Sequence, residues 1–219
     1  MSHGKHFTLY SHKAAPNGWK PAFLLNELGL SYETVYLDLF VTGEQKKPEY
    51  LKLNPNGRVP TLIDHKNNDL TVWESGAILL YLVDKYDTEK KYTGADDKGK
   101  AEVLQWLFFQ VSGQGPYFGQ AAWFANFHHE QLPSAIERYK AEIKRVLGVL
   151  ESVLSKQEWL AAGKFTIADL AFVSWNNVGV IAQTVDFETD FPATYKWHQK
   201  LQQIAGIKAG LAERARLNA

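Results

Sequence analysis

The chain has 219 residues, enough for one large or two small domains with hydrophobic cores of their own. Lysine and arginine together number 24, as do aspartate and glutamate, so no net charge attracts nucleic acid or an anionic membrane. Cysteine is absent, which excludes disulfides, thiolate metal sites and a thiol nucleophile of the protein's own. Any thiol chemistry must therefore use a thiol that a ligand brings.

The sequence predicts neither a membrane segment nor a metal site. No apolar run approaches the ~20 residues of a membrane-spanning helix. The start, MSHGKHFTLY, lacks the apolar stretch of a signal peptide and the Arg- and Ser-rich character of a transit peptide, so we expect a cytosolic protein. The seven histidines show no metal-ligand spacing, and His128-His129 reads as a solvated helix end.

The first part of the chain has the pattern of an α/β domain. A strand is predicted over residues 7–10, a helix over 19–28 and a second strand over 32–37. This order implies a right-handed crossover between parallel strands. An antiparallel hairpin and a helix that begins at Ser75 follow, which completes a thioredoxin-like domain over residues 1–87.

The rest of the chain, residues 98–219, is predicted to be an all-helical domain that follows a polar linker. An amphipathic helix over 100–110 is broken or kinked by Gly and Pro at 113–116, and a long helix covers 134–155. The segment Thr166–Asp169 has the form of a capping box that opens a very apolar helix. Two shorter helices are expected to close the chain.

The stretch from Asn54 to Ser75, NPNGRVPTLIDHKNNDLTVWES, suits a small zwitterionic ligand that resembles a peptide. With a cis Val59-Pro60 bond, the Val59 backbone would offer its N–H and C=O to an extended peptide. Ser75 lies at a helix start, where free N–H groups and the helix dipole favour a carboxylate. Glu74 would hold an ammonium group, and Arg58 a second carboxylate.

Each of these features also has an ordinary explanation. The Val59-Pro60 bond could be trans, which base rates favour by roughly twenty to one. Glu74 and Ser75 could be only a capping pair, and Arg58 a solvated turn residue. Taken singly, these explanations are the better ones. The three features together, in this order and this close, favour the ligand site, and we predict a cis Val59-Pro60 bond beside it.

The sequence resembles the cytosolic glutathione transferases over essentially its whole length. The RVP turn, the ES pair and the FTIAD box are similar to that family's glutathione clamp and folding signature. SHKAAPNGWK and WESGAILLYLVDKY resemble the fungal nitrogen-regulator/prion-type members and the related bacterial Nu class. The long Asn/Gln-rich N-terminal extension of the prion-type regulator is missing, so its prion and nitrogen-repression roles are not carried over.

The resemblance implies a fold, a co-substrate and site residues. It implies a glutathione transferase fold and a homodimer, and it assigns glutathione to the four clamp residues Arg58, Val59, Glu74 and Ser75. Gln45 corresponds to a position that contacts the glycyl end. Asn17 corresponds to the residue placed near the glutathione sulfur, and Ala15 stands where the Nu class often has a threonine.

Asn17 has a chemical reason to lie near the sulfur. A free thiol has a pKa of ~8.5, so only about 3% is thiolate at pH 7. An amide donor near the positive end of a helix would favour the thiolate. Tyr10 and Ser11 are rival donors in the same region, and Asn17 could instead cap the helix that follows it.

The aromatic run Trp123, Phe124 and Phe127 is core by default, but it could equally wall an apolar second-substrate pocket. The expected activity is conjugation of glutathione to electrophiles, with peroxidase activity as a further use. Two alternatives stay open: disulfide reduction or deglutathionylation by two bound glutathiones, and a non-catalytic regulator or carrier that keeps the clamp. The sequence does not name the physiological second substrate.

Overall fold

The computed structural model describes residues 4–219, and the chain divides into two compact units. The first unit runs to Glu89 and also takes in Gln203–Ala219, and the second unit is Lys90–Gln202. The first contains a mixed sheet with helices and the second is helical, so the predicted fold class, a thioredoxin-like α/β domain plus an all-α domain, is confirmed.

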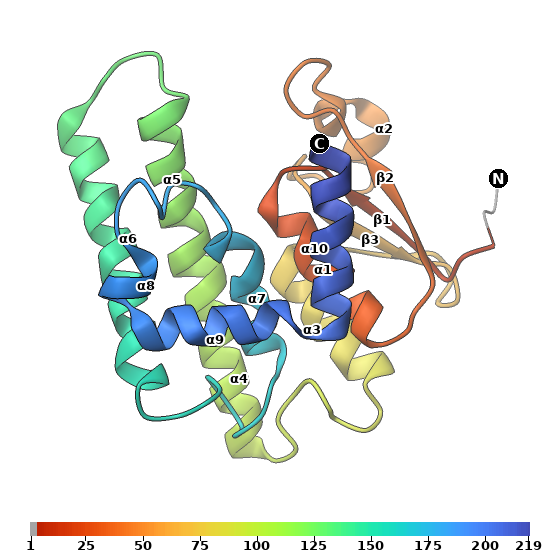
Figure 1. Cartoon of the computed structure of the whole chain (residues 1–219). Helices are drawn as coiled ribbons and strands as arrows, with labels where there is room; N and C mark the ends of the chain where they lie inside the picture. Colours follow the sequence, from red (N-terminus) through yellow and green to blue (C-terminus); the bar gives the residue numbers. More distant parts are fainter. Residues whose placement is uncertain (1–3) are drawn as a thin grey trace. The chain divides into compact units, whose positions relative to one another are not determined.

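A four-stranded sheet with the order β2-β1-β3-β4 forms the centre of the first unit (Figure 1). Its strands are β1 (Phe7–Ser11), β2 (Tyr32–Tyr36), β3 (Thr61–Asp64) and β4 (Leu70–Trp73). The pair β1 and β2 is parallel, as the strand–helix–strand pattern predicts, and the other two pairs are antiparallel. Since β4 has one neighbour, it is an edge strand, and Leu70 and Trp73 on it are exposed.

Helices α1 (Trp19–Glu27), α3 (Ser75–Tyr86) and α10 (Ala205–Asn218) belong to the same unit, and α1 packs against both of the others. The one-turn helix α2 (Pro48–Leu51) precedes β3. Fully buried side chains from β1, α1, β3 and α3 form the core of the unit: Phe7, Leu9, Phe23, Leu62, Ile78 and Leu79. These apolar faces explain why short strands of four or five residues are stable here.

The last helix packs with the first unit, whereas the sequence pattern predicted one helical domain over all of 98–219. Asn26 Nδ2 on α1 donates to the Gly206 carbonyl at 3.1 Å, and the Gly206 N–H donates to the Glu27 carboxylate. The amphipathic pattern of a helix shows that one face is buried but does not show against which element. The chain end therefore returns to a helix that lies about 180 residues earlier.

The second unit contains α4 (Asp97–Phe109), α5 (Gly115–Asn126), α6 (Pro133–Leu154), α7 (Ile167–Asn176), α8 (Phe187–Asp190) and α9 (Pro192–Gln202). The break predicted at 113–116 takes the form of a π-helical segment, Gln110–Gln114, that joins α4 to α5. Proline at the second position of α5 leaves the preceding backbone without a regular i→i−4 partner, which favours the wider turn.

Asp169 organises the start of α7. The predicted capping box is present. The Thr166 side chain accepts from a backbone N–H of the first turn, and the Asp169 side chain accepts from the Thr166 backbone N–H. Asp169 Oδ1 also accepts from Leu160 N at 2.9 Å and from Trp197 Nε1 at 3.0 Å. The side chain is completely buried, and burial raises the pKa of this carboxyl to about 6 despite its hydrogen bonds.

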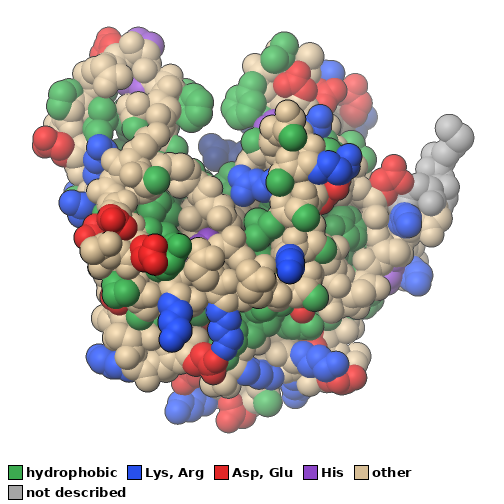
Figure 2. All heavy atoms as spheres, viewed as in Figure 1, with side chains coloured by type: hydrophobic (Ala, Val, Ile, Leu, Met, Phe, Trp, Pro, Cys, Tyr) green, Lys and Arg blue, Asp and Glu red, His purple; other side chains and the backbone are tan. Residues whose placement is uncertain are grey.

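No described helix of residues 4–219 combines the length and the apolar character that a membrane crossing needs. On the face shown in Figure 2, Lys and Arg side chains lie among Asp and Glu side chains. This mixture agrees with the equal numbers of basic and acidic residues, 24 each, in the sequence.

Replacing Asp169 with alanine should lower the free energy of unfolding by about 3 kcal/mol or more, because three buried donors lose their acceptor. Asp186→Ala is the matched control, since Asp186 is an exposed N-cap of α8 that accepts from Thr189 N at 3.2 Å. The control should cost about 1 kcal/mol or less. Urea denaturation of both variants measures the difference, and equal losses would contradict it.

Candidate functional site

The turn from Asn54 to Pro60 is held by buried side chains beneath it. Asn54 is 2% exposed, and its Nδ2 donates to the Arg58 carbonyl at 2.8 Å and to Thr61 Oγ1 at 3.1 Å. The Tyr50 hydroxyl donates to the same carbonyl at 2.7 Å. The Val59-Pro60 peptide bond is cis, as predicted. Because Asn54 and Tyr50 are buried donors to it, the Arg58 carbonyl faces inward. The Arg58 side chain is exposed, and Val59 is half-buried.

The sheet brings this turn next to the start of α3. In the β3–β4 hairpin Thr61 lies opposite Trp73, so Val59 and Pro60 share one end of the sheet with Glu74 and Ser75. Asn56 Nδ2 donates to the exposed Glu74 carboxylate at 3.3 Å, which links the turn to that residue. The structure thus gathers the four predicted clamp residues at one place.

Glu74 has a strained backbone. Its φ is +72° and its ψ is 119°, in a region that non-glycine residues rarely adopt. Such a conformation costs about 1–3 kcal/mol and clusters at functional sites. No sequence signal marks it, because glutamate does not favour positive φ.

Gln45 lies on a 3₁₀ turn, Glu44–Lys46, that touches the clamp turn. A Cβ on Gly57 would lie 2.8 Å from the Gln45 carbonyl, and Gly57 has a φ of +59°, so only glycine fits there. The Gln45 amide itself donates to the Leu39 carbonyl at 3.0 Å. Among the described residues its buried Oε1 has no hydrogen-bond partner.

Lys20 lies beneath the clamp, where no feature of the sequence predicted it. Its side chain is 1% exposed, and Nζ donates to Ser75 Oγ at 3.3 Å. Burial lowers the pKa of Lys20 to about 7, and the nearby Glu74 carboxylate opposes this shift. A lysine in a helix normally reads as solvated, so only the fold reveals that this one is interior.

Asn17 is in the middle of a 3₁₀ turn, Pro16–Gly18, that leads into α1, and its side chain is half-buried. Gly18, and not Asn17, occupies the N-cap position of α1. The turn places Asn17 just before the positive end of α1, where a donor to an anion is favoured.

Several donors hold the loop that precedes Asn17. The backbone N–H groups of Ala14 and Ala15 both donate to His12 Nδ1 at 3.1 Å. From α10, Arg214 Nη2 donates to the Ala14 carbonyl at 2.6 Å, and Asn218 donates to the Lys13 carbonyl at 3.1 Å. The last helix thus positions the loop that carries Asn17, the predicted hydrogen-bond donor to the glutathione sulfur.

The two rivals of Asn17 point elsewhere. The Tyr10 ring packs edge-on against Tyr50, with 5.5 Å between ring centroids. Ser11 is 2% exposed and lies directly under Gly18, where a Cβ would come within 1.9 Å of Ser11 Oγ. These positions favour Asn17 over both rivals as the residue that faces a ligand.

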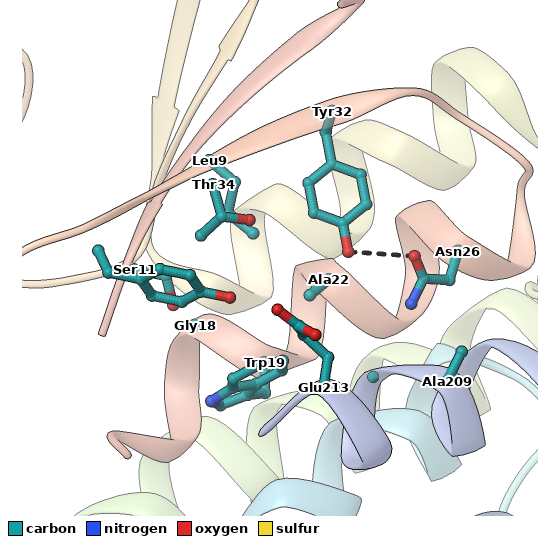
Figure 3. A pocket seen from close by; sticks show the side chains of 12 residues that line it. Leu9, Ser11, Gly18, Trp19, Ala22, Asn26, Tyr32, Thr34, Ala209 and Glu213 are labelled. Carbon is teal, nitrogen blue, oxygen red and sulfur yellow. Dashed lines mark hydrogen bonds between the residues drawn. The ribbon is translucent and has the colours of Figure 1, made fainter. Parts of the chain in front are cut away.

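Ser11 instead lines a partly open pocket of about 440 Å³ between α1, β2 and α10 (Figure 3). In Figure 3 the Glu213 carboxylate points into this pocket from α10. The Tyr32 hydroxyl donates to Asn26 Oδ1 at 3.0 Å on the same wall, and burial raises the pKa of Tyr32 to about 12. Glu213 is itself paired with Arg216 at 2.7 Å, so the pocket has a satisfied polar wall.

The predicted aromatic wall lies on α5 and just after it. Trp123 is 50% exposed and Phe127 69% exposed, so neither is a core residue. Phe124 stacks on Tyr139 of α6, with 5.6 Å between ring centroids. Exposed rings beside a packed one are what an apolar ligand surface requires.

The loop after α5 holds the histidine pair for which no metal site was predicted. Potential ligand atoms of His128, His129 and Glu130 lie within 4.8 Å of one another. His129 and Glu130 are exposed and His128 is half-buried, and such groups are common without an ion. The three residues are consecutive in the chain, and the cluster carries no assignment.

Comparison with known families matches both units. Residues 5–84 match the family model of the glutathione S-transferase N-terminal domain, and residues 115–204 match that of the C-terminal domain. Glutathione S-transferase 2 of Schizosaccharomyces pombe is 53% identical over 96% of this chain and 97% of its own length. The transcriptional regulator URE2 of Saccharomyces cerevisiae is 42% identical over 93% of this chain and 67% of its own.

Solved structures show the same similarity. The glutathione transferase URE2P6 from Phanerochaete chrysosporium, solved with oxidized glutathione, is 59% identical, with a TM-score of 0.94 over 99% of this chain and 100% of that one. Ure2p in complex with glutathione is 42% identical, with a TM-score of 0.90 over 97% and 96% of the two chains.

The strained backbone at Glu74 leads to a prediction for two variants of that residue. Glu74→Gly should be about 1 kcal/mol more stable to unfolding than Glu74→Ala, because glycine adopts a φ of +72° without the steric cost that alanine meets. Both variants lack the carboxylate, so its loss cancels in the comparison. Thermal denaturation of the pair measures the difference, and an alanine variant of equal or greater stability would show that the strain is absent.

Proposed function

The chain belongs to the glutathione S-transferase family, and on that premise we propose that it binds glutathione and activates its thiol for transfer to electrophiles. The observation that carries this proposal is the convergence of the Val59 backbone, Glu74 and Ser75 at one end of the sheet. Glutathione is a peptide with a zwitterionic head group, a central thiol and a second carboxylate. The site offers a group of the appropriate chemistry for each part.

The ends of glutathione would bind as follows. The α-carboxylate of the γ-glutamyl group meets Ser75 and the first N–H groups of α3, and the ammonium meets Glu74. The Val59 backbone pairs with the cysteinyl residue as an added strand would. Arg58, with Gln45 beside it, meets the glycyl carboxylate. In this reading the domain over residues 1–87 is the glutathione-binding domain.

Asn17 is the residue we propose for activation of the sulfur. Its amide lies at the turn before α1, so an N–H donor and the helix dipole both act on an anion there. A pKa shift of about two units, worth about 2.7 kcal/mol, would make most of the bound thiol thiolate at pH 7. The structural case is strengthened because Tyr10 and Ser11 are packed elsewhere.

The helical unit, Lys90–Gln202, would supply the second-substrate pocket, with Trp123, Phe124 and Phe127 as its apolar wall. Conjugation of apolar electrophiles is a detoxification chemistry, and peroxides are a second class of substrate. No metal is needed for either reaction. Measuring the turnover of a generic electrophile with glutathione tests this proposal. Binding of glutathione without turnover would favour a carrier or regulator.

One observation favours a second activity, disulfide reduction or deglutathionylation. The chain has no cysteine, so the second thiol of a disulfide exchange must come from another glutathione. A similar protein has been solved with oxidized glutathione, which consists of two joined glutathiones. Turnover of a mixed disulfide with glutathione, compared with turnover of the electrophile, would rank the two activities.

We also propose a cytosolic homodimer. Leu70 and Trp73 on the edge strand β4 are exposed in the first unit, and Leu104 and Phe108 on α4 are exposed in the second. Exposed apolar side chains of this size commonly mark interfaces between subunits. Each unit therefore has an apolar surface that a second copy of the chain could cover.

The dimer predicts a clear result in sedimentation. The wild type should sediment as a dimer at micromolar concentration, and Phe108→Glu should shift it toward monomer, because a charge would be buried without a partner. Phe127→Glu is the control, since Phe127 is as exposed as Phe108 but lies outside the proposed interface. A wild-type monomer, or equal effects of both variants, would contradict the proposal.

Replacing Asn17 with alanine should raise the pKa of the thiol of bound glutathione by about one unit or more, since one donor to the charged sulfur is lost. Turnover near pH 7 should fall about tenfold or further, while glutathione affinity and melting temperature change little. Thiolate absorbance against pH measures the shift, with Asn67→Ala, in the distant β3–β4 turn, as the control. If the titrations of wild type and Asn17→Ala coincide, Asn17 is not the activating residue.

A further inference from the structure

The buried lysine beneath the clamp has no role in the function proposed so far. Lysine is rarely fully buried, and Lys20 is 1% exposed at the second position of α1. Its Nζ donates to Ser75 Oγ at 3.3 Å, and Ser75 is 6% exposed at the first position of α3. The amino group is thus one hydroxyl away from the place where a ligand head group would bind.

We propose, resting on the glutathione site above, that Lys20 is a positioning residue that makes this site selective for ligands with an α-carboxylate. A serine hydroxyl has one hydrogen to donate and two lone pairs. Because Oγ accepts from Lys20, its own hydrogen points away from the lysine and is available to the carboxylate. The chain from ammonium to hydroxyl to carboxylate is polarised along its length, which strengthens each bond.

The charges at the site fit a zwitterionic head group. The Glu74 carboxylate is the charged group that acts electrostatically on Lys20. The negative charge of Glu74 suits the ammonium of the ligand, and the positive charge of Lys20 suits its carboxylate. On α10, which also packs against α1, Glu213 pairs with Arg216 at 2.7 Å, Arg214 donates to the Ala14 carbonyl at 2.6 Å, and Lys208 is exposed. When it is protonated, Lys20 therefore adds its positive charge to the partial charge of the helix dipole at the start of α3.

The charge state of Lys20 gives the selectivity a pH dependence. Burial lowers the pKa of Lys20 to about 7 in the empty site, so at higher pH the amine is largely neutral there. A bound carboxylate favours the protonated form, so binding must take up a proton above about pH 7. The advantage of a ligand with the carboxylate should therefore shrink as the pH rises from about 6 to about 8.5.

The test uses S-methylglutathione, which has no thiol to titrate, and its analogue with 4-aminobutanoyl in place of the γ-glutamyl group. The analogue keeps the amine and lacks only the α-carboxylate. The wild type should bind S-methylglutathione about tenfold or more tightly than the analogue at about pH 6, by calorimetry or fluorescence titration. Lys20→Met should lose most of this preference, with its affinity for the analogue nearly unchanged.

Leu24→Met is the matched control, because Leu24 is a fully buried residue of the same helix and the change alters packing without altering charge. It should keep the wild-type preference. With glutathione itself, Lys20→Met should raise KM about tenfold while kcat stays near that of the wild type, since the lysine acts on the head group and not on the sulfur.

The outcomes separate this inference from the function on which it rests. If the wild type binds neither compound, the proposed glutathione site is wrong. If it binds S-methylglutathione but Lys20→Met weakens both compounds equally, Lys20 has only a packing role and the inference fails. If Lys20→Met does not fold, the wild type alone decides: a preference that is equal at about pH 6 and about pH 8.5 overturns the role of the lysine charge.

Discussion

The inward-facing carbonyl of Arg58 is the constraint on which the candidate site depends. Asn54 and Tyr50 both donate to it, at 2.8 and 2.7 Å, and both are buried. With this carbonyl held inside, the turn cannot rotate, so the Val59 backbone stays at the sheet end that Glu74 and Ser75 share. The geometry of the proposed peptide site therefore rests on interior hydrogen bonds and not on the exposed side chains that would touch the ligand.

The same site contains two features that oppose folding. Glu74 has a positive φ, which costs about 1–3 kcal/mol, and Lys20 places an amine in the interior, where its charged form is disfavoured. Both lie at the start of α3. Local conflicts of this kind are expected at functional sites, where activity and not stability decides the residue.

The loop that carries Asn17 depends on the far end of the chain. Arg214 and Asn218 on α10 donate to the carbonyls of Ala14 and Lys13, and His12 accepts from the next two N–H groups. A loop held on both sides loses little entropy when it orders around a ligand. The return of α10 to the first unit is thus part of the arrangement that positions the proposed activating residue.

The sequence by itself determined the fold class, the antiparallel hairpin, the start of α3 at Ser75 and the capping box at Thr166, because these rest on local turn chemistry and on residue periodicity. It also placed the cis bond before Pro60. Only the tertiary structure decided that α10 joins the first unit, that Lys20 is interior and that Ser11 lies under Gly18. Those facts depend on which surfaces meet across long stretches of chain, and a helix or strand pattern records that a face is buried without recording its partner.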